Sequence, residues 1–187
     1  MKRIEIEVPE GKTAKWVNGV LTLIDESSKN VMERIKTFKD AYNELGKGHP
    51  FVIQYDKIYD NLILDGNLER SKDLIAYIKL RIIAAALNEG WQPQFTEDEY
   101  RYFPWFYLYT QKEIDEMSEE DKARVVCRSN FYANAYGGVA YAHTFYVSTN
   151  TNEHLGSRLA FKTRELAEYA GKQFVEIYAD FNFKPDK

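Results

Sequence analysis

Residues 100–110 read Tyr100-Arg101-Tyr102-Phe103-Pro104-Trp105-Phe106-Tyr107-Leu108-Tyr109-Thr110, and this aromatic run decides the fold. Its pattern is extended, and successive side chains of a strand point to opposite faces. One face holds Tyr100, Tyr102, Phe106 and Leu108, and the other holds Phe103, Trp105, Tyr107 and Tyr109. A strand that is apolar on both faces is typical of one covered on both sides.

Pro104 changes this prediction, because proline has no N–H to donate to a ladder and is found at sheet edges or bulges. We therefore expect a bulged or edge-proximal strand near Pro104, with a helix covering one face. The other face is where we expect any function to reside. Burial of Trp105, Tyr107 and Tyr109 would indicate a core or a self-association surface, whereas an open groove edged by arginine would indicate ligand binding.

Further extended segments follow the aromatic run. They are Arg124–Arg128, Phe131–Tyr136, Val139–Val147 and Arg158–Phe161, and an acidic helical insert, Gln111–Lys122, precedes them. Gly137-Gly138 predicts a two-residue hairpin turn, and a terminal helix opens at Thr163. The fold class that we predict is α+β, with a mostly antiparallel sheet of about five strands in the C-terminal half packed against helices.

Three helices are predicted between residue 31 and the aromatic run. The first has Thr37 as its N-cap, Asp40 three residues on, and Gly46 just past its end. The second begins near Pro50. The third, Ser71–Asn88, carries two apolar stripes, which indicates a helix packed on more than one side.

The N-terminal residues predict a β-hairpin module. Lys15–Leu23 forms the hairpin around Asn18-Gly19, because both central positions of a type I′ turn need positive φ. Lys2–Val8 alternates charged and apolar residues, as a strand does. We predict a hairpin module over residues 1–25 and a single α+β domain over residues 31–187, with one continuous domain over residues 1–187 as the alternative.

Composition bounds the class of protein. The 187 residues are 44% hydrophobic, and they include 14 Tyr, 11 Phe and 3 Trp, so a core or an interface must be aromatic.

The net charge of -4 argues against a strongly basic nucleic-acid binder or a polybasic membrane-surface protein. With one cysteine, Cys127, no disulfide can form within the chain. No apolar signal or membrane-spanning stretch is present, so we expect a cytoplasmic protein without membrane association.

Aromatic side chains beside arginine can form a stacking platform for nucleic-acid bases or for a ligand. The candidates for ligand or partner binding are residues of the aromatic run and two arginines of the weakly basic region that follows, namely Arg101, Trp105, Tyr107, Tyr109, Arg128 and Arg158. Core packing or self-association is the favoured interpretation of the aromatic run. Single-stranded nucleic-acid binding is the alternative, since the C-terminal part of the chain is weakly basic.

No catalytic, cofactor or metal site is predicted. Cys127 with His143 or His154 could form a nucleophile and base, but His143 lies two residues from Tyr141 and Phe145 and is better explained as a core histidine. Cys127 is likewise expected to be a small buried hydrophobe. The three histidines lack the close spacing of a helical zinc site, and no glycine-rich phosphate loop occurs.

Four stretches together resemble a family of uncharacterised proteins from gut bacteria and their phages and prophages. The stretches are Lys15–Asp25, Arg34–Ala41, Leu87–Trp91 through Pro104-Trp105-Phe106, and Ser157–Lys162 through Ala170–Phe174, and the last two are the most specific. The resemblance implies an accessory or virion-related protein of a mobile element, made in a bacterial cytoplasm. It implies no activity and no site residue.

The function that we expect is therefore a non-enzymatic interaction or assembly protein, because no catalytic constellation is visible and the aromatic content exceeds what one small core needs. A protein partner or a second copy of the chain is the expected ligand. Single-stranded nucleic acid is the alternative, and a Cys127-dependent enzyme is the third, disfavoured possibility.

Overall fold

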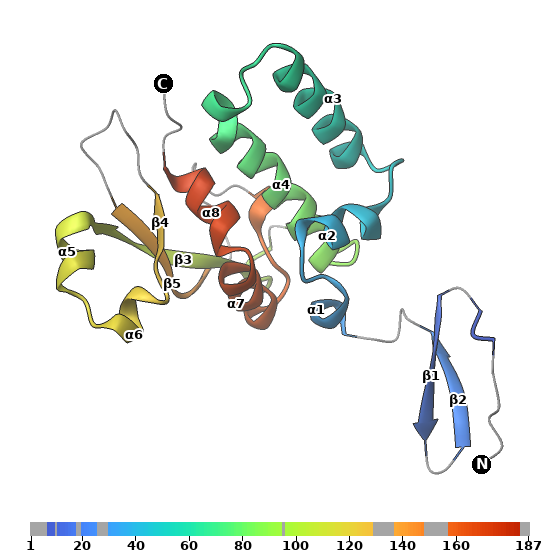
Figure 1. Cartoon of the computed structure of the whole chain (residues 1–187). Coiled ribbons are helices and arrows are strands. Elements are labelled where there is room, and N and C mark those ends of the chain that lie inside the picture. The colour runs from blue at the N-terminus through green and yellow to red at the C-terminus, as the bar shows by residue number, and fades with distance from the viewer. Residues whose placement is uncertain are drawn as a thin grey trace, which may run out of the picture.

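The structure is a computed structural model, and it describes residues 7–9, 11–17, 20–25, 30–94, 96–128, 137–147 and 157–183. From residue 30 onward the described elements form an α+β arrangement (Figure 1). A small sheet is the first layer, α7 (Arg164–Gln173) and α8 (Val175–Asn182) pack on it, and α4 (Lys72–Leu87) packs on α8. The fold therefore has one sheet layer and two helix layers.

The N-terminal hairpin is confirmed. β1 (Lys12–Val17) pairs with β2 (Val20–Asp25) in antiparallel register, and Val17 stands opposite Val20. This register leaves two residues between the strands, as a two-residue hairpin loop requires. The predicted strand over Lys2–Val8 lies mostly outside the described residues.

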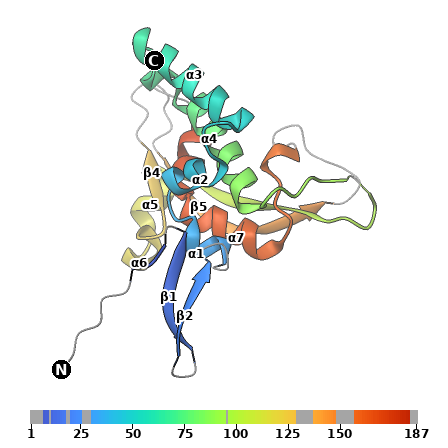
Figure 2. The same ribbon diagram turned by 90° about the vertical axis from the view of Figure 1, so that its right-hand side faces the viewer.

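Local sequence signals fix the first helices. α1 (Val31–Arg34) is capped by Asn30, and α2 (Phe38–Leu45) has a complete capping box between Thr37 and Asp40. Gly46 follows α2 with a φ of 75°, a conformation that glycine adopts without a Cβ penalty. α3 (Pro50–Leu64) begins with proline at its first turn and runs beside α4 in both views (Figures 1 and 2). The predicted helices at Thr37 and Pro50 are confirmed.

α4 is the central helix of the core, as its two apolar stripes predict. Nine of its residues are buried, and it contacts α2, α3, α7 and α8. The core around it combines α4 with side chains of the C-terminal helices and of residues 159–161, among them Leu80, Ile82, Ile83, Leu87, Phe161, Leu166, Phe174 and Tyr178. A helix apolar on more than one side is buried on more than one side.

The C-terminal sheet contains β3 (Arg101–Thr110), β4 (Val126–Arg128) and β5 (Gly137–Val147). Its order is β3-β5-β4, and both pairings are antiparallel. Between β3 and β4 lie two short helices, α5 (Gln111–Glu116) and α6 (Glu119–Lys122), which confirm the predicted acidic insert. The long strand at residues 101–110 is also confirmed.

The prediction of about five strands in this sheet is wrong, because the described residues give a sheet of three. Arg158–Phe161 is not a strand: Ser157–Leu159 form a 3₁₀ turn, η3, and Phe161 makes one isolated bridge to Tyr102. Phe131–Tyr136 lies outside the described residues. The α+β class holds, but with a smaller sheet and more helix than the pattern indicated.

The predicted turn at Gly137-Gly138 is also wrong. Both glycines lie within β5, opposite Thr110 and Tyr109. A Cβ on Gly137 would lie against the Tyr109 carbonyl oxygen, and one on Gly138 would lie against the Val125 side chain. These glycines permit close approach of neighbouring chain segments, which is a second use of glycine that a dipeptide pattern does not distinguish from a turn.

Candidate functional site

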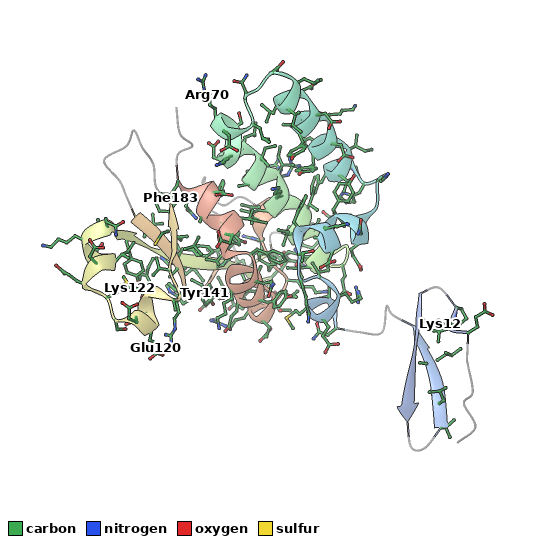
Figure 3. The ribbon with its side chains drawn as sticks, in the orientation of Figure 1. Lys12, Arg70, Glu120, Lys122, Tyr141 and Phe183 are labelled. Atoms are coloured by element: carbon green, nitrogen blue, oxygen red, sulfur yellow. The ribbon has the colours of Figure 1, made fainter. Side chains whose placement is uncertain are left out.

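Helices α7 and α8 cover one face of the three-stranded sheet. A Cβ on Gly171 of α7 would meet Tyr141 at 2.5 Å and Pro104 at 2.7 Å, so the helix lies directly on these two side chains. The ring of Phe106 packs on Tyr178 of α8, with 4.6 Å between the ring centroids. Figure 3 shows Tyr141 beside α7. Pro104, Phe106 and Tyr141 therefore define the helix-covered face.

The opposite face carries large aromatic side chains that remain exposed. Trp105 and Tyr107 alternate with Pro104 and Phe106 along β3, so they point away from α7 and α8. Trp105 keeps 46% of its surface exposed and Tyr107 keeps 54%. We call the set Trp105, Tyr107, His143 and Phe145 the aromatic face. The apolar pattern on both faces of the strand favoured a strand covered on both sides. That interpretation is wrong for this face, because Trp105 and Tyr107 are exposed.

Rings from β5 complete the aromatic face. His143 stands opposite Trp105, and the two rings stack at 6.0 Å with 25° between their planes. Phe145 contacts Trp105 edge-on at 5.9 Å and keeps 43% of its surface exposed. Such cross-strand pairs hold rings in fixed positions on a sheet. The face is therefore an aromatic surface whose rings contact one another across two paired strands.

The expectation that His143 belongs to the core is wrong, and a β-bulge explains why. Phe106 pairs with Tyr141 while Trp105 pairs with His143, so Ala142 is an extra residue in β5. One inserted residue sends Tyr141 and His143 to opposite faces, although a spacing of two would put them on the same face. Exposed His143 thus joins the aromatic face, and sequence periodicity carries no signal of the inserted residue.

The aromatic face is bounded differently at its two ends. Toward the start of β3 the exposed surface ends at Phe103, because the Phe103 side chain is buried. Toward the end of β3, burial and then the neighbours Tyr107, Asp121 and Glu113 raise the pKa of Tyr109. The Glu113 carboxylate of α5 accepts hydrogen bonds from the N–H and the Oγ1 of Thr110, the residue after Tyr109.

Segment 111–124 is more acidic than basic. Its charged side chains are Glu113, Asp115, Glu116, Glu119, Glu120 and Asp121 against Lys112, Lys122 and Arg124. Glu120 and Lys122 stand at this end of the sheet in Figure 3. The aromatic face consequently has an acidic border on the side of α5 and α6, which attracts cationic groups and repels phosphates.

β3 forms an edge of the sheet, as Pro104 predicts. The N–H and carbonyl of Tyr102 bond to Phe161, on the side away from β5. Because these directions alternate along a strand, the ring nitrogen of Pro104 also faces outward, where no ladder bond is lost. The predicted bulged or edge-proximal strand, covered on one face by a helix, is confirmed.

The structure separates the six residues that sequence analysis grouped. Trp105, Tyr107 and Tyr109 share one face of β3, with Tyr109 at its partly buried end. Arg101 lies on the same strand but is 1% exposed, so it cannot edge an open groove. Arg128 belongs to β4, where its backbone pairs with Gly137. Arg158 stands in η3 beside a separate cleft formed with α3 and α4.

The structure does not bring Cys127 and His143 together. Cys127 is exposed on β4 and its backbone pairs with Gly138, which lies five residues before His143 on β5. At about 3.3 Å per residue this spacing is roughly 16 Å along the strand, far beyond a hydrogen bond. His154 lies outside the described residues. The expectation that Cys127 is buried is wrong.

A second cleft, of about 190 Å³, lies between α4 and α8 beside Tyr59. Its charged lining residues are Glu69, Lys72, Lys79 and Asp180, and Lys72 pairs with Glu69. Burial lowers the pKa of Lys79, and the charge of Asp180 raises it in part. Because both signs of charge meet there, the cleft has no preference for an anion or a cation.

Within the described ranges, no group of three or more His, Cys, Asp or Glu side chains could hold a metal ion. In the same residues, no helix is both long enough and apolar enough to cross a membrane. Comparisons with protein-family models, with curated proteins and with solved structures found no match to this chain.

Proposed function

We propose that this protein is an interaction or assembly protein that binds a partner protein on its aromatic face. The observation that carries the proposal is the exposure of Trp105, Tyr107 and Phe145 on a sheet face that α7 and α8 leave open. Tryptophan and tyrosine dominate the binding energy of protein interfaces. A contiguous exposed aromatic surface is typical of an interaction site.

The rigidity of the face supports tight binding. Trp105, His143 and Phe145 are already in ring contact with one another, and β3 is anchored to α7 through Pro104. Ordering flexible side chains is one of the costs of association. Since these rings sit on paired strands, little of that cost remains to be met when a partner binds.

The acidic border supports a partner with basic side chains. A segment that lies along the aromatic face past Tyr109 approaches the Glu113 carboxylate, which caps Thr110. Lysine or arginine in that segment would be attracted, which steers association and fixes orientation. The partner that the surface fits is therefore a protein segment with apolar residues for the rings and basic residues for the border.

The same border argues against the nucleic-acid alternative on this surface. A stacking platform for single strands needs cations beside the rings to hold the phosphates. Among the arginines proposed for that role, Arg101 is buried and Arg158 lines a cleft elsewhere. Phosphates drawn along the rings would meet Glu113 and Asp121 instead.

Photo-crosslinking tests the proposal directly. Tyr107 is replaced by photoreactive p-benzoylphenylalanine, which keeps an aromatic ring at the exposed position. Lys57, exposed on α3, receives the same group as the matched control. We expect position 107, and not position 57, to form adducts with one protein segment containing apolar and basic residues.

The crosslinked segment is then synthesised and its affinity measured. Because Trp105 is central to the face, Trp105→Ser should weaken binding by about 2 kcal/mol, roughly thirtyfold. Tyr100→Ser, which removes an exposed ring that pairs with Tyr146 outside the aromatic face, is the control. Adducts only with nucleic acid, only with a second copy of this chain, or equal at positions 107 and 57 would each overturn the proposal.

A further inference from the structure

A cleft of about 200 Å³ lies at the C-terminal end of α4, on elements other than the aromatic face. Phe51, Trp91 and Pro93 give it apolar walls, and Arg158 is the charged residue of its lining. The walls come from α3, from the chain just after α4, and from η3. Three segments distant in the sequence thus converge on one hollow.

The shape of this cleft is fixed by hydrogen bonds beneath it. Asn88, which is buried, donates from Nδ2 to the carbonyl of Ala160 at 2.8 Å. Its Oδ1 accepts from the N–H of Lys162 at 3.0 Å. Asn88 therefore ties the end of α4 to the segment that carries Arg158. Asn88 also lines the cleft, and these two hydrogen bonds hold its amide in place.

The turn that places Trp91 is also held in position. Glu89 adopts a φ of 49° and Gly90 a φ of 82°, which reverses the chain after the helix. The Glu89 carboxylate pairs with Arg34 and with Lys162, each at 3.2 Å. A left-handed conformation at a residue other than glycine persists only where its surroundings hold it. Here the ion pairs to Arg34 and Lys162 hold Glu89 in place. The Glu89 carboxylate is therefore already paired.

One cation, Arg158, lines the cleft, and its described lining contains no acidic residue. The Arg81 guanidinium lies 4.2 Å from the centre of the Phe51 ring and donates to Gln54 at 2.8 Å. Its Nε is buried and has no hydrogen-bond partner within the described residues. Burial lowers the pKa of Arg81, Tyr77 raises it in part, and the charge of Arg158 has a smaller lowering effect. The Arg81 guanidinium thus packs on the Phe51 wall, while Arg158 lines the cleft itself.

We infer that this cleft binds a small planar anion, meaning a ring that stacks against Phe51 and Trp91 and carries a phosphate or carboxylate that pairs with Arg158. Arginine recognises both anions through parallel N–H donors. The cleft is smaller than the usual pocket of a drug-sized ligand, so it accommodates one ring system with the anionic group at its mouth. This site is independent of the aromatic face and of the partner proposed there.

The test uses the whole chain labelled with 5-fluorotryptophan and observed by ¹⁹F NMR. The chain has three tryptophans, so Trp91 reports the cleft and Trp105 reports the aromatic face in one spectrum. Single Trp→Phe variants assign the signals. The probes are uridine 5′-monophosphate, 4-hydroxybenzoate, uridine and inorganic phosphate.

We expect the monophosphate or the aromatic carboxylate to shift the Trp91 signal saturably and leave the Trp105 signal in place. Uridine, which lacks the anion, and inorganic phosphate, which lacks the ring, should each bind at least about tenfold more weakly. Arg158→Gln should weaken binding by at least about tenfold, because it removes a charge-assisted hydrogen bond. Arg70→Gln, at the other end of α4 (Figure 3), removes the same charge from an exposed site and should change nothing.

Three results would overturn the inference. The first is a Trp91 signal that neither the monophosphate nor the carboxylate moves at millimolar concentration. The second is equal binding of uridine or phosphate alone, which would show that ring and anion are not recognised together. The third is equal weakening by Arg158→Gln and Arg70→Gln, which would reflect net charge and not the cleft.

Discussion

Tyr178 shows how burial of a single polar side chain makes stability depend on pH. Its ring packs on Phe106 beneath the sheet, and burial raises the pKa of its phenol above the ordinary value. Burial also raises the pKa of Tyr55, to about 12. A phenol whose folded-state pKa is raised contributes stability below the unfolded-state pKa of about 10, and that contribution is lost as pH rises further.

We therefore expect Tyr178→Phe to match the natural protein near neutral pH and to be the more stable of the two above about pH 10. The substitution keeps the ring and removes the group that would have to ionise. Urea unfolding followed at a series of pH values measures the difference. Tyr100→Phe, at an exposed ring, is the control and should show no such divergence. Parallel alkaline loss of stability in all three proteins would contradict this account.

At the scale of elements, the contact between α7 and the sheet depends on Gly171. A Cβ at that position would stand 2.5 Å from the Tyr141 ring, closer than real side-chain contacts permit. Either the helix must rise or the ring must move, and both disturb a close-packed layer. The glycine is therefore required by packing between elements, since its φ is not in the left-handed region.

Gly171→Ala should consequently lower the free energy of unfolding by about 1–3 kcal/mol, despite the better helix propensity of alanine. Urea denaturation measures the loss. Gly48→Ala, where a Cβ would meet open space, is the matched control and should be close to neutral. A Gly171→Ala variant as stable as the control would show that α7 does not lie on Tyr141.

Elements with local signals were predictable from the sequence. Thr37, Asp40 and Gly46 delimit α2 because capping chemistry acts within a few residues, and the two apolar stripes of α4 repeat over several turns. The hairpin around residues 18 and 19 follows from turn geometry. In each case the physical cause lies inside the segment itself.

Elements decided by distant contacts were not predictable. Gly137-Gly138 resembles a turn, but the close approach of Tyr109 and Val125 makes it part of a strand. The bulge at Ala142 inverts the face of His143, and no pattern in β5 marks the inserted residue. For the candidate site, Trp105 and Tyr107 were identified from the sequence, whereas His143 joined them only through this bulge.

At the scale of the whole molecule, the described core begins at Val31 and includes no residue of the hairpin. The prediction of a separate module over residues 1–25 can therefore be tested by shortening the chain. A protein beginning at Asn30, which retains the cap of α1, should keep the urea midpoint and the m-value of the longer chain, because the hairpin would expose no core surface on unfolding. A loss of more than about 1 kcal/mol would show that the hairpin is part of the folded domain.

The central claim is that the face of β3 and β5 opposite α7 is open, with Trp105 at its centre. In the double variant Trp16→Phe and Trp91→Phe, Trp105 is the single tryptophan of the chain. Its fluorescence then measures the exposure of this face directly. We predict red-shifted emission and efficient quenching by acrylamide, as for a half-exposed indole, and protection once the partner segment is bound. Blue-shifted emission that acrylamide does not quench in the free protein would contradict the claim, because the face would then be covered.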